Sequence, residues 1–323
     1  MKILITGVHG FVGSNLVKAL SKEHEIFGLD IIAPQKDGVK FTFGWEHLDG
    51  KEIPAMDAII HLAGKAHDTK NQSAAETYFK VNTDLTKRIY DYFLAHDSIR
   101  KFIFFSTAKA AADRVEGVLT EDVTPAPVGP YGESKIAAEQ YILEHPAPAS
   151  SLEGVESACG QKQVYIFRPC MIHGPGNKGN LNLLYGVVKK GIPWPLGAFE
   201  NRRTFTSIEN ICFAVNGVLT KDVPSGIYNM GDDEARSTNE LIEEICKSLG
   251  KKAHIWRLPK GLMTSVAKLG GVLHLPLNPE RLQKLTENYV SSNAKIKKAL
   301  GIDKMPVDAR TGLQRTLESF KEK

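Results

Sequence analysis

Apolar residues follow two alternating patterns along the first half of the chain. Segments with helical spacing, such as Ser14–Ser21, lie between short apolar runs that are typical of buried strands. Strands that alternate with helices predict an α/β fold in which helices cover both faces of a parallel sheet. The predicted strands are Ile3–Ile5, Ile26–Leu29, Ala58–Leu62, Phe102–Phe105 and Val164–Phe167.

The second half of the chain is less regular. Loops rich in Gly, Pro and Asn separate helical patterns at Ile208–Leu219 and Asn239–Leu249, and a short strand is expected at Gly226–Met230. We therefore expect two unequal domains. Residues 1–172, with 206–232 returning to them, form the larger domain, and residues 173–205 and 233–323 form the smaller one.

Composition narrows the function classes. The 323 residues are 42% hydrophobic and 24% charged, which suffices for a large core, and Lys plus Arg exceed Asp plus Glu by 41 to 37. This small excess predicts a small anionic ligand, with no nucleic acid and no membrane as partner. Four cysteines without ligand spacing predict neither a metal site nor disulfides. With no leader or membrane-spanning segment expected, the protein is predicted to be cytoplasmic.

A glycine motif follows the first predicted strand and precedes the first predicted helix. Gly7, Gly10 and Gly13 have the spacing of a dinucleotide-binding turn, in which a pyrophosphate lies on the positive end of the helix. Asp30 ends the next strand, where a carboxylate binds the adenosine ribose and repels a 2′-phosphate. Because Ile31 and Ile32, and no arginine, follow Asp30, the sequence favours NAD over NADP. The alternative is a glycine-rich turn that binds no ligand.

A second motif joins Tyr131 and Lys135. On a helix, residues four positions apart lie on the same face, so the ammonium group stands near the phenol. A neighbouring cation lowers the pKa of a phenol and prepares it for proton transfer. The alternative is an exposed helix that carries a Tyr and a Lys by chance, but the glycine motif upstream favours catalysis.

With these motifs in order, the chain resembles the extended short-chain dehydrogenases/reductases, in the group of NAD-dependent nucleotide-sugar epimerases and dehydratases that includes UDP-galactose 4-epimerase. Further motifs that carry the resemblance are Asp57-Ala-Ile-Ile-His-Leu-Ala-Gly64, Val81-Asn-Thr83, Phe105-Ser-Thr107, Arg168-Pro169 and Gly174-Pro-Gly176. The resemblance implies a Rossmann-type doubly wound parallel sheet that binds NAD, and a smaller C-terminal α/β domain that binds a nucleotide sugar.

The resemblance also implies roles for individual residues. Thr107 is implied to bond the reacting sugar oxygen beside the catalytic Tyr131 and Lys135, although it could instead cap the end of a strand. His61 is expected to be a packed structural histidine. Cofactor contacts are implied for Gly7, Gly10, Phe11, Val12, Gly13, Asp30, Leu62, Ala63, Gly64, Asn82 and Lys135.

Substrate contacts are implied in the second half of the chain. Asn180, Leu181 and Arg203 fall where the relatives hold UDP, and Arg281 lies near a second arginine position. A guanidinium group suits a diphosphate because it donates parallel hydrogen bonds and keeps its charge. The alternative is that Arg202 and Arg203 are ordinary surface charges.

Departures from the family pattern limit the activity. Ala108-Lys109 replaces the Asp-Glu pair of the dehydratases, so dehydration is not expected, and Met171 replaces an asparagine of UDP-galactose 4-epimerase. Residues 174–181, 193–197 and 201–203 resemble enzymes of surface-polysaccharide synthesis that reduce UDP-4-keto-6-deoxy-N-acetylhexosamines at C4. Epimerase and 4-ketoreductase, both acting by hydride transfer at C4 of a UDP-sugar, stay open, and so does a catalytically silent dinucleotide-binding or redox-sensing protein.

The resemblance further implies a homodimer. In the relatives, two helices pack against their own copies around a two-fold axis. One carries the Tyr-Lys pair, and the other follows the asparagine that is Asn82 here. Here Leu85, Ile89, Tyr92 and Phe93 form an apolar stripe at helical spacing. The alternative is that this stripe packs on the sheet of its own chain.

Overall fold

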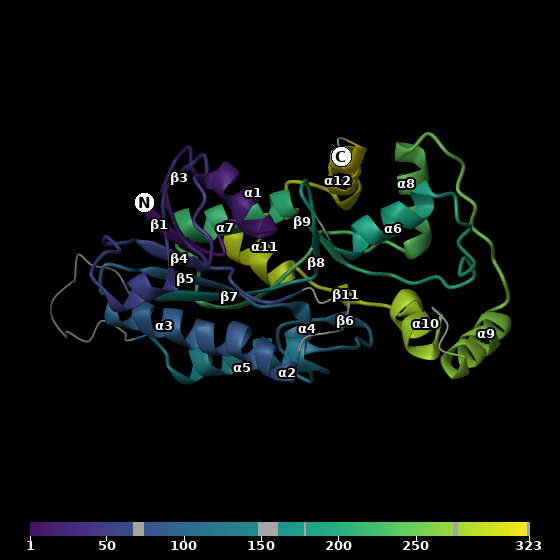
Figure 1. Ribbon diagram of the computed structural model, residues 1–323, viewed down its shortest axis with the longest axis horizontal. Helices are drawn as coiled ribbons and strands as arrows, with labels where there is room; N and C mark the ends of the chain where they lie inside the picture. Colours follow the sequence, from purple (N-terminus) through teal and green to yellow (C-terminus); the bar gives the residue numbers. More distant parts are fainter. Residues whose placement is uncertain (67–73, 148–160, 178, 274–276, 322–323) are drawn as a thin grey trace.

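The computed structural model describes residues 1–66, 74–147, 161–177, 179–273 and 277–321. Its centre is a seven-stranded parallel sheet in the order β10-β7-β5-β4-β1-β2-β3 (Figure 1). The predicted α/β class and all six predicted strands are confirmed. The strands are β1 (Lys2–Thr6), β2 (Glu25–Leu29), β3 (Val39–Phe43), β4 (Ala58–His61), β5 (Lys101–Phe105), β7 (Gln163–Pro169) and β10 (Gly226–Met230).

The continuous apolar runs of the sequence are explained by burial on both faces of this sheet. On β1, Ile3 and Ile5 enter one core cluster and Leu4 enters the other, because successive side chains of a strand point to opposite faces. Strand β3 lies at the edge of the sheet and is partly exposed. Its apolar and polar residues alternate, as expected of a half-buried strand, but the sequence analysis missed it.

Two helical layers cover the sheet. On one face, α1 (Phe11–Leu20), α7 (Ile208–Thr220) and α11 (Ala294–Leu300) share a core cluster with the sheet. On the other, α3 (Leu85–Ala95) and α5 (Pro130–Glu144) pack, as Figure 1 shows.

The apolar stripe of α3 lies inside its own chain. Ile89 and Phe93 are fully buried and Tyr92 is nearly so, in the core cluster beneath the sheet, while Leu85 is half-buried. The prediction that this stripe forms a dimer surface is therefore wrong, because the sheet of the same chain covers it. The alternative, packing on the sheet, is confirmed.

The C-terminal half lies beyond one end of the large sheet (Figure 1). There α6 (Asn180–Lys189), α8 (Thr238–Ser248) and α12 (Ala309–Lys321) share a hydrophobic cluster. A smaller cluster joins α9 (Lys260–Val272) and α10 (Pro279–Thr286). The remaining elements are η1 (Trp45–Asp49), α2 (Ala75–Tyr78), η2 (Phe79–Asp84), α4 (Ala108–Ala111) and two short sheets, β8 (Met171–His173) with β9 (Phe205–Ser207) and β6 (Val118–Leu119) with β11 (Val290–Ser291).

Local sequence signals fix where several helices begin. At α8, the Ser237 hydroxyl accepts from the Glu240 backbone N–H at 3.0 Å, and the Glu240 carboxylate accepts from the Ser237 N–H at 2.6 Å. This reciprocal pair is a capping box. Helix α5 begins with Pro130, whose fixed φ suits the first helical position. None of the described helices is both long and apolar enough to cross a membrane.

Candidate active site

The site is built where the strand order of the large sheet reverses. Strands β1 and β4 are neighbours, yet the chain leaves β1 toward β2 on one side and reaches β5 beyond β4 on the other. In open parallel sheets, ligands bind at the carboxyl ends of the strands at this switch point. The glycine motif follows β1 and Ala63-Gly64 follows β4, so two predicted cofactor segments meet there.

The glycine turn is too tight for side chains. Gly7 has a left-handed φ of 68°, and a Cβ at Gly13 would lie 2.5 Å from the Gly7 carbonyl oxygen and 2.8 Å from that of Val8. Among the described residues, no side chain caps α1 at Gly10. Phe11 and Val12 form the first turn of this helix, whose positive end suits a pyrophosphate. The turn therefore fits a dinucleotide.

Asp30 is fixed beside this turn. Its carboxylate accepts hydrogen bonds from the backbone N–H of His9 at 3.1 Å and of Ile31 at 2.8 Å. Lys36, which the sequence analysis did not single out, donates to the Ser14 hydroxyl at 2.6 Å and to the Val8 carbonyl at 3.2 Å. Burial lowers the pKa of Lys36 and the charge of Asp30 raises it, which places the two charges near each other.

Gly64 lies against two other predicted cofactor residues. A Cβ at Gly64 would lie 3.0 Å from the Asn82 Oδ1 and 3.1 Å from the Lys135 Nζ. The backbone before it is held by Thr6, whose hydroxyl accepts from the N–H groups of Leu62 at 3.1 Å and Ala63 at 3.0 Å. The strand end, the asparagine and the lysine thus lie close together, with no room for a side chain at position 64.

Asn82 ties the loop after β4 to α5. Its Oδ1 accepts from the Lys65 N–H at 2.7 Å, and its Nδ2 donates to the Lys65 carbonyl at 3.1 Å and to the Ser134 hydroxyl at 2.9 Å. The residue lies in a π-helical turn, a geometry that often marks functional sites. Its part in holding a cofactor stays a prediction.

Lys135 is buried at the end of β5. Its ammonium donates to the Phe105 carbonyl at 2.8 Å and lies 4.9 Å from the centre of the Phe104 ring. Burial lowers its pKa to about 8, although the carboxylate of Glu139 acts in the opposite direction. Lys135 is therefore close to its titration point at neutral pH.

Tyr131 and Thr107 meet beside this lysine. A side-chain hydrogen bond joins them, and Thr107 also caps α4, accepting from the Lys109 N–H at 3.3 Å. Thr107 therefore acts as a cap, as the alternative held, at the start of α4 just beyond the end of β5, and it also contacts Tyr131. The prediction of a lowered phenol pKa is wrong for this structure: burial raises the pKa of Tyr131, and the Thr107 hydrogen bond offsets only part of that effect.

A buried ion pair behind the site was missed by the sequence analysis. Glu139 and Arg168 are fully buried, and the Arg168 Nε donates to both carboxylate oxygens at 3.0 and 3.1 Å. Ser106 also donates to this carboxylate. Glu139 lies one helical turn after Lys135, and this spacing of a buried lysine and a glutamate was the one signal in the sequence that pointed to the ion pair. The pair fixes α5 against β7 and so positions the helix that carries Tyr131.

His61 is the structural residue that was expected. It is fully buried, and its two ring nitrogens bond the hydroxyls of Thr6 at 2.7 Å and Thr86 at 2.9 Å. Burial holds its pKa well below the ordinary value. It is neutral and takes no part as a base.

The predicted substrate residues lie in the C-terminal half. Arg203 is held by backbone hydrogen bonds to Arg236, and its guanidinium donates to the Lys284 carbonyl of α10 at 3.1 Å. Arg281 lies one turn earlier on α10, so the structure brings the two predicted arginines to neighbouring elements. Asn180 is exposed at the start of α6, whereas Leu181 is buried in the hydrophobic cluster there.

No carboxylate follows Thr107 directly. Lys109 takes that place and donates to the Asp113 carboxylate at 3.0 Å and to the Asp113 carbonyl at 2.7 Å. Its ammonium also lies 4.7 Å from the centre of the Tyr289 ring. Where the dehydratases carry a catalytic acid, this chain has Lys109, whose ammonium group is bound to Asp113.

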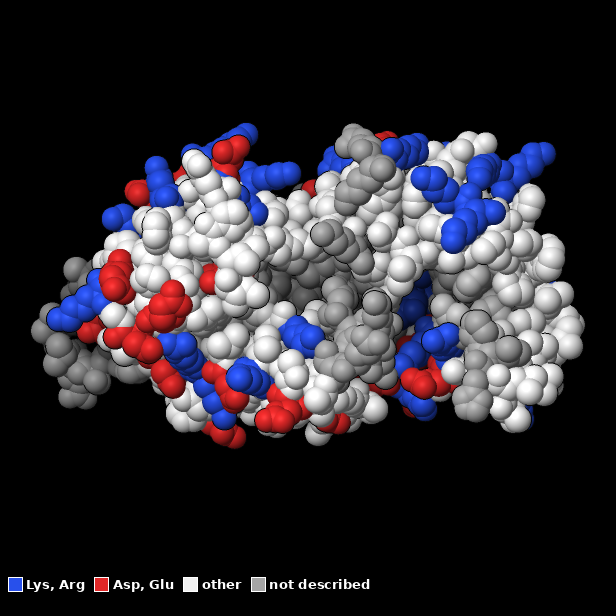
Figure 2. All heavy atoms as spheres, in the orientation of Figure 1, with Lys and Arg blue, Asp and Glu red and all other residues white. Residues whose placement is uncertain are grey.

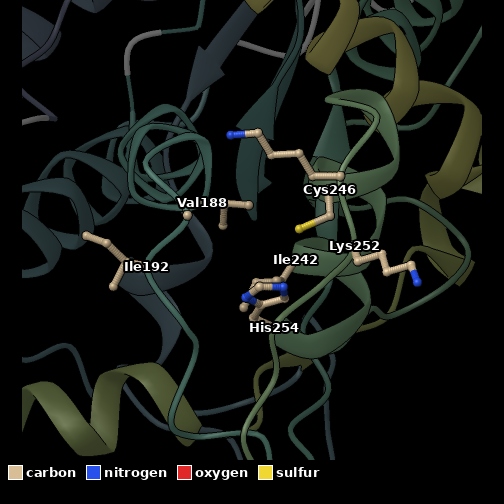
Figure 3. Close-up of a pocket in the computed structure, with 8 residues that line it drawn as sticks. Val188, Ile192, Ile242, Cys246, Lys252 and His254 are labelled. Atoms are coloured by element: carbon tan, nitrogen blue, oxygen red, sulfur yellow. The ribbon is translucent and has the colours of Figure 1, made fainter.

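A separate cavity of about 270 Å³ lies between α6 and α8 (Figure 3). Its walls hold no predicted site residue, and burial raises the pKa of the Cys246 thiol there, which disfavours the thiolate. The lining residues are Val188, Gly191, Ile192, Ile242, Cys246, Lys251, Lys252 and His254.

A glycine turn at the switch point, with a tyrosine, a threonine and a buried lysine at the same edge, defines a dinucleotide-dependent enzyme of the extended short-chain dehydrogenase/reductase class. Comparison with known proteins agrees. The chain belongs to the NAD dependent epimerase/dehydratase family, which it matches over residues 3–231. NAD is the cofactor of this family.

Individual relatives support the same placement. The chain is 31% identical to a UDP-glucose 4-epimerase of Vibrio cholerae, with 98% of this chain and 95% of that one covered. Two solved structures share its fold: MoeE5 in complex with UDP-glucose and NAD, and UDP-glucuronic acid 4-epimerase of Bacillus cereus in complex with NAD. The first has a TM-score of 0.74 at 19% identity and the second 0.73 at 21%, each covering 100% of this chain and 99% of the other.

Proposed function

We propose that the protein is an NAD-dependent UDP-sugar 4-epimerase or 4-ketoreductase in which Tyr131 is the general acid and base. The observation that carries this proposal is the hydrogen bond between Tyr131 and Thr107 beside the buried Lys135. Epimerases and ketoreductases need the same device, a proton carrier next to a ring carbon that exchanges hydride. The names of the Vibrio cholerae relative and of the two solved structures support a UDP-sugar.

The chain's own residues account for the proton and the charge. NAD(H), when bound by the glycine turn, would supply the hydride-transfer chemistry. Tyr131 holds the proton that moves to or from the sugar oxygen, and the Thr107 hydroxyl positions the phenol. Lys135 adds positive charge that stabilises a phenolate. Because burial raises the Tyr131 pKa, the phenol is protonated at neutral pH, which is the form that delivers a proton to a ketone oxygen.

The other predicted site residues lie in two domains, one for the cofactor and one for the substrate. We propose that residues 1–172 and 206–232 bind NAD through the glycine turn, Asp30, Asn82 and Gly64. Residues 173–205 and 233–323 hold the UDP group, with Arg203 and Arg281 on the diphosphate and Asn180 and Leu181 at the start of α6. Lys109 in place of an acid argues against dehydration.

Measuring how much cofactor is consumed per product formed tests this proposal. The protein is incubated with NADH and a UDP-4-keto-6-deoxy-N-acetylhexosamine, and separately with UDP-N-acetylglucosamine and NAD, while cofactor absorbance and product stereochemistry are followed. Stoichiometric NADH consumption identifies a reductase, and exchange of epimers without net cofactor change identifies an epimerase. NAD binding with no turnover on any UDP-sugar would instead support the catalytically silent alternative.

A further inference from the structure

One segment of the chain is basic throughout. Between Glu244 and Glu280 there is no acidic residue, and six basic residues occur: Lys247, Lys251, Lys252, Arg257, Lys260 and Lys268. The whole chain has an excess of only four, 41 Lys and Arg against 37 Asp and Glu. This segment therefore carries more positive charge than the complete protein, and it contains α9.

Helix α9 presents apolar residues on two sides. Met263, Ala267 and Gly270 are buried, and the first two pack with Leu196 and Leu282. A second row points outward at helical spacing, with exposed fractions between 44% and 58%. We call this row the α9 stripe; its residues are Leu262, Val266, Leu269 and Leu273.

The surroundings of the stripe are also unusual for a surface. Trp256, which precedes α9, is 54% exposed, and Val272 is exposed as well. Figure 2 shows few charged side chains over the end of the molecule that carries α9, and Lys and Arg side chains gather higher on that face, toward α6 and α8. Figure 1 places α9 at the end away from the large sheet. Contiguous apolar surface of this kind marks an interaction site.

The chemistry of the segment decides between two occupants. A second copy of the chain would bring Arg257, Lys260 and Lys268 near their own copies around a two-fold axis, which costs energy because like charges repel. An anionic lipid surface complements the same charges. Amphipathic helices with an apolar stripe, flanking lysines and a tryptophan lie in the plane of such surfaces.

We propose that the α9 stripe docks the protein on a bilayer surface that contains anionic phospholipids. The apolar residues enter the boundary between headgroups and acyl chains, and Arg257, Lys260 and Lys268 contact the phosphates. This proposal departs from the sequence-based expectation of no membrane partner, which considered the charge of the whole chain. It concerns peripheral attachment and does not depend on which sugar the enzyme converts.

Vesicle sedimentation tests the proposal. The full-length protein is mixed with vesicles of phosphatidylcholine alone, or of phosphatidylcholine and phosphatidylglycerol in equal parts, at low and high salt. We expect binding to the mixed vesicles only, and weaker binding at high salt because added ions screen the charges. The double variant Leu262→Glu, Leu269→Glu should reduce binding at least tenfold.

A matched control separates docking from misfolding. Phe41→Glu with Val118→Glu replaces two side chains that are each 56% exposed, on β3 and β6, and this variant should bind vesicles as the unaltered protein does. Both double variants should keep the thermal stabilisation that NAD gives. Full vesicle binding by the α9 variant would overturn the proposal, and so would equal binding to neutral vesicles. Loss of a dimer in the α9 variant, without vesicle binding by the unaltered protein, would assign the stripe to a second copy.

Discussion

Tyr131 carries the chemistry in the proposed mechanism, and its replacement is the most direct test. Tyr131→Phe removes the proton carrier but keeps the ring, so we expect turnover to fall by a factor of about 10² to 10⁴. NAD affinity should survive. Thr107→Ala should cost less, because it removes one hydrogen bond and the cap of α4 but leaves the phenol. Steady-state kinetics with the converted UDP-sugar measure both effects, and full activity of Tyr131→Phe would contradict the assigned site.

Asp30 sets the choice between NAD and NADP. Its carboxylate is fixed by two backbone N–H groups next to the glycine turn, where it would repel a 2′-phosphate. We expect tighter binding of NADH than of NADPH, and Asp30→Ala should narrow the difference because the nearby ammonium of Lys36 is then unopposed. Titrations of both cofactors check this. Equal or tighter binding of NADPH by the unaltered protein would be the contrary result.

Lys135 predicts a pH dependence. Its pKa is lowered to about 8 by burial, so its positive charge is lost as the pH rises through that value. If this charge supports proton transfer by Tyr131, kcat/KM should fall above about pH 8, since kcat/KM reports the pKa values of the free enzyme. Lys135→Met should be poorly active at every pH and should lack this limb. A flat profile from about pH 7 to 9 would exclude the role.

The residue scale also shows what sequence can and cannot predict. The glycines, Tyr131 and Lys135 were predicted because each chemistry requires a fixed local spacing. The direction of the Tyr131 pKa was not, because it depends on how deeply the phenol is buried by elements far away in the sequence. Lys36 was missed for the same reason. It bonds Val8 and Ser14, which lie more than twenty residues away in the sequence, so no local motif reveals the contact.

At the scale of elements, the turn between β1 and α1 is the part least tolerant of change. Gly13→Ala would place a Cβ 2.5 Å from the Gly7 carbonyl, and overpacking of this kind costs about 1–3 kcal/mol. NAD affinity should fall with it. Gly186→Ala, within α6, is the matched control, because nothing lies within 4 Å of its new Cβ and alanine should stabilise that helix by about 0.5–1 kcal/mol. Thermal melts with and without NAD distinguish the two.

Elements buried on both faces were the easiest to predict. Strands β1, β4 and β5 have unbroken apolar runs because two core clusters cover them. The two-residue strands β6 and β11 were missed because so short a length leaves little pattern. Edge strand β3 was missed although its five residues alternate apolar and polar side chains, the pattern of a half-buried strand. Helix α3 shows the opposite error: an apolar stripe reveals that a face is covered, but not whether its own chain or a second copy covers it.

At the scale of the whole molecule, the resemblance still predicts a homodimer through α3 and α5. Since the α3 stripe is buried internally, the outer faces of these helices would have to meet. Leu143 on α5 is 54% exposed, and Leu143→Glu should weaken such a dimer by about tenfold or more, the value of burying a leucine. Phe41→Glu, on edge strand β3, is the control. Sedimentation of the unaltered protein as a monomer at micromolar concentration would contradict the dimer.

The position of β10 has a consequence for synthesis on the ribosome. Among the described strands this one pairs with β7 alone, although the whole segment from Pro169 to Gly226 separates them along the chain. While that segment is being translated, one edge of β7 has no partner and exposes unpaired backbone groups, as edge strands that promote aggregation do. Completion of the sheet must therefore wait until Met230 has left the exit tunnel. A nascent chain stalled before this residue should be a preferred substrate for chaperones that shield exposed strands.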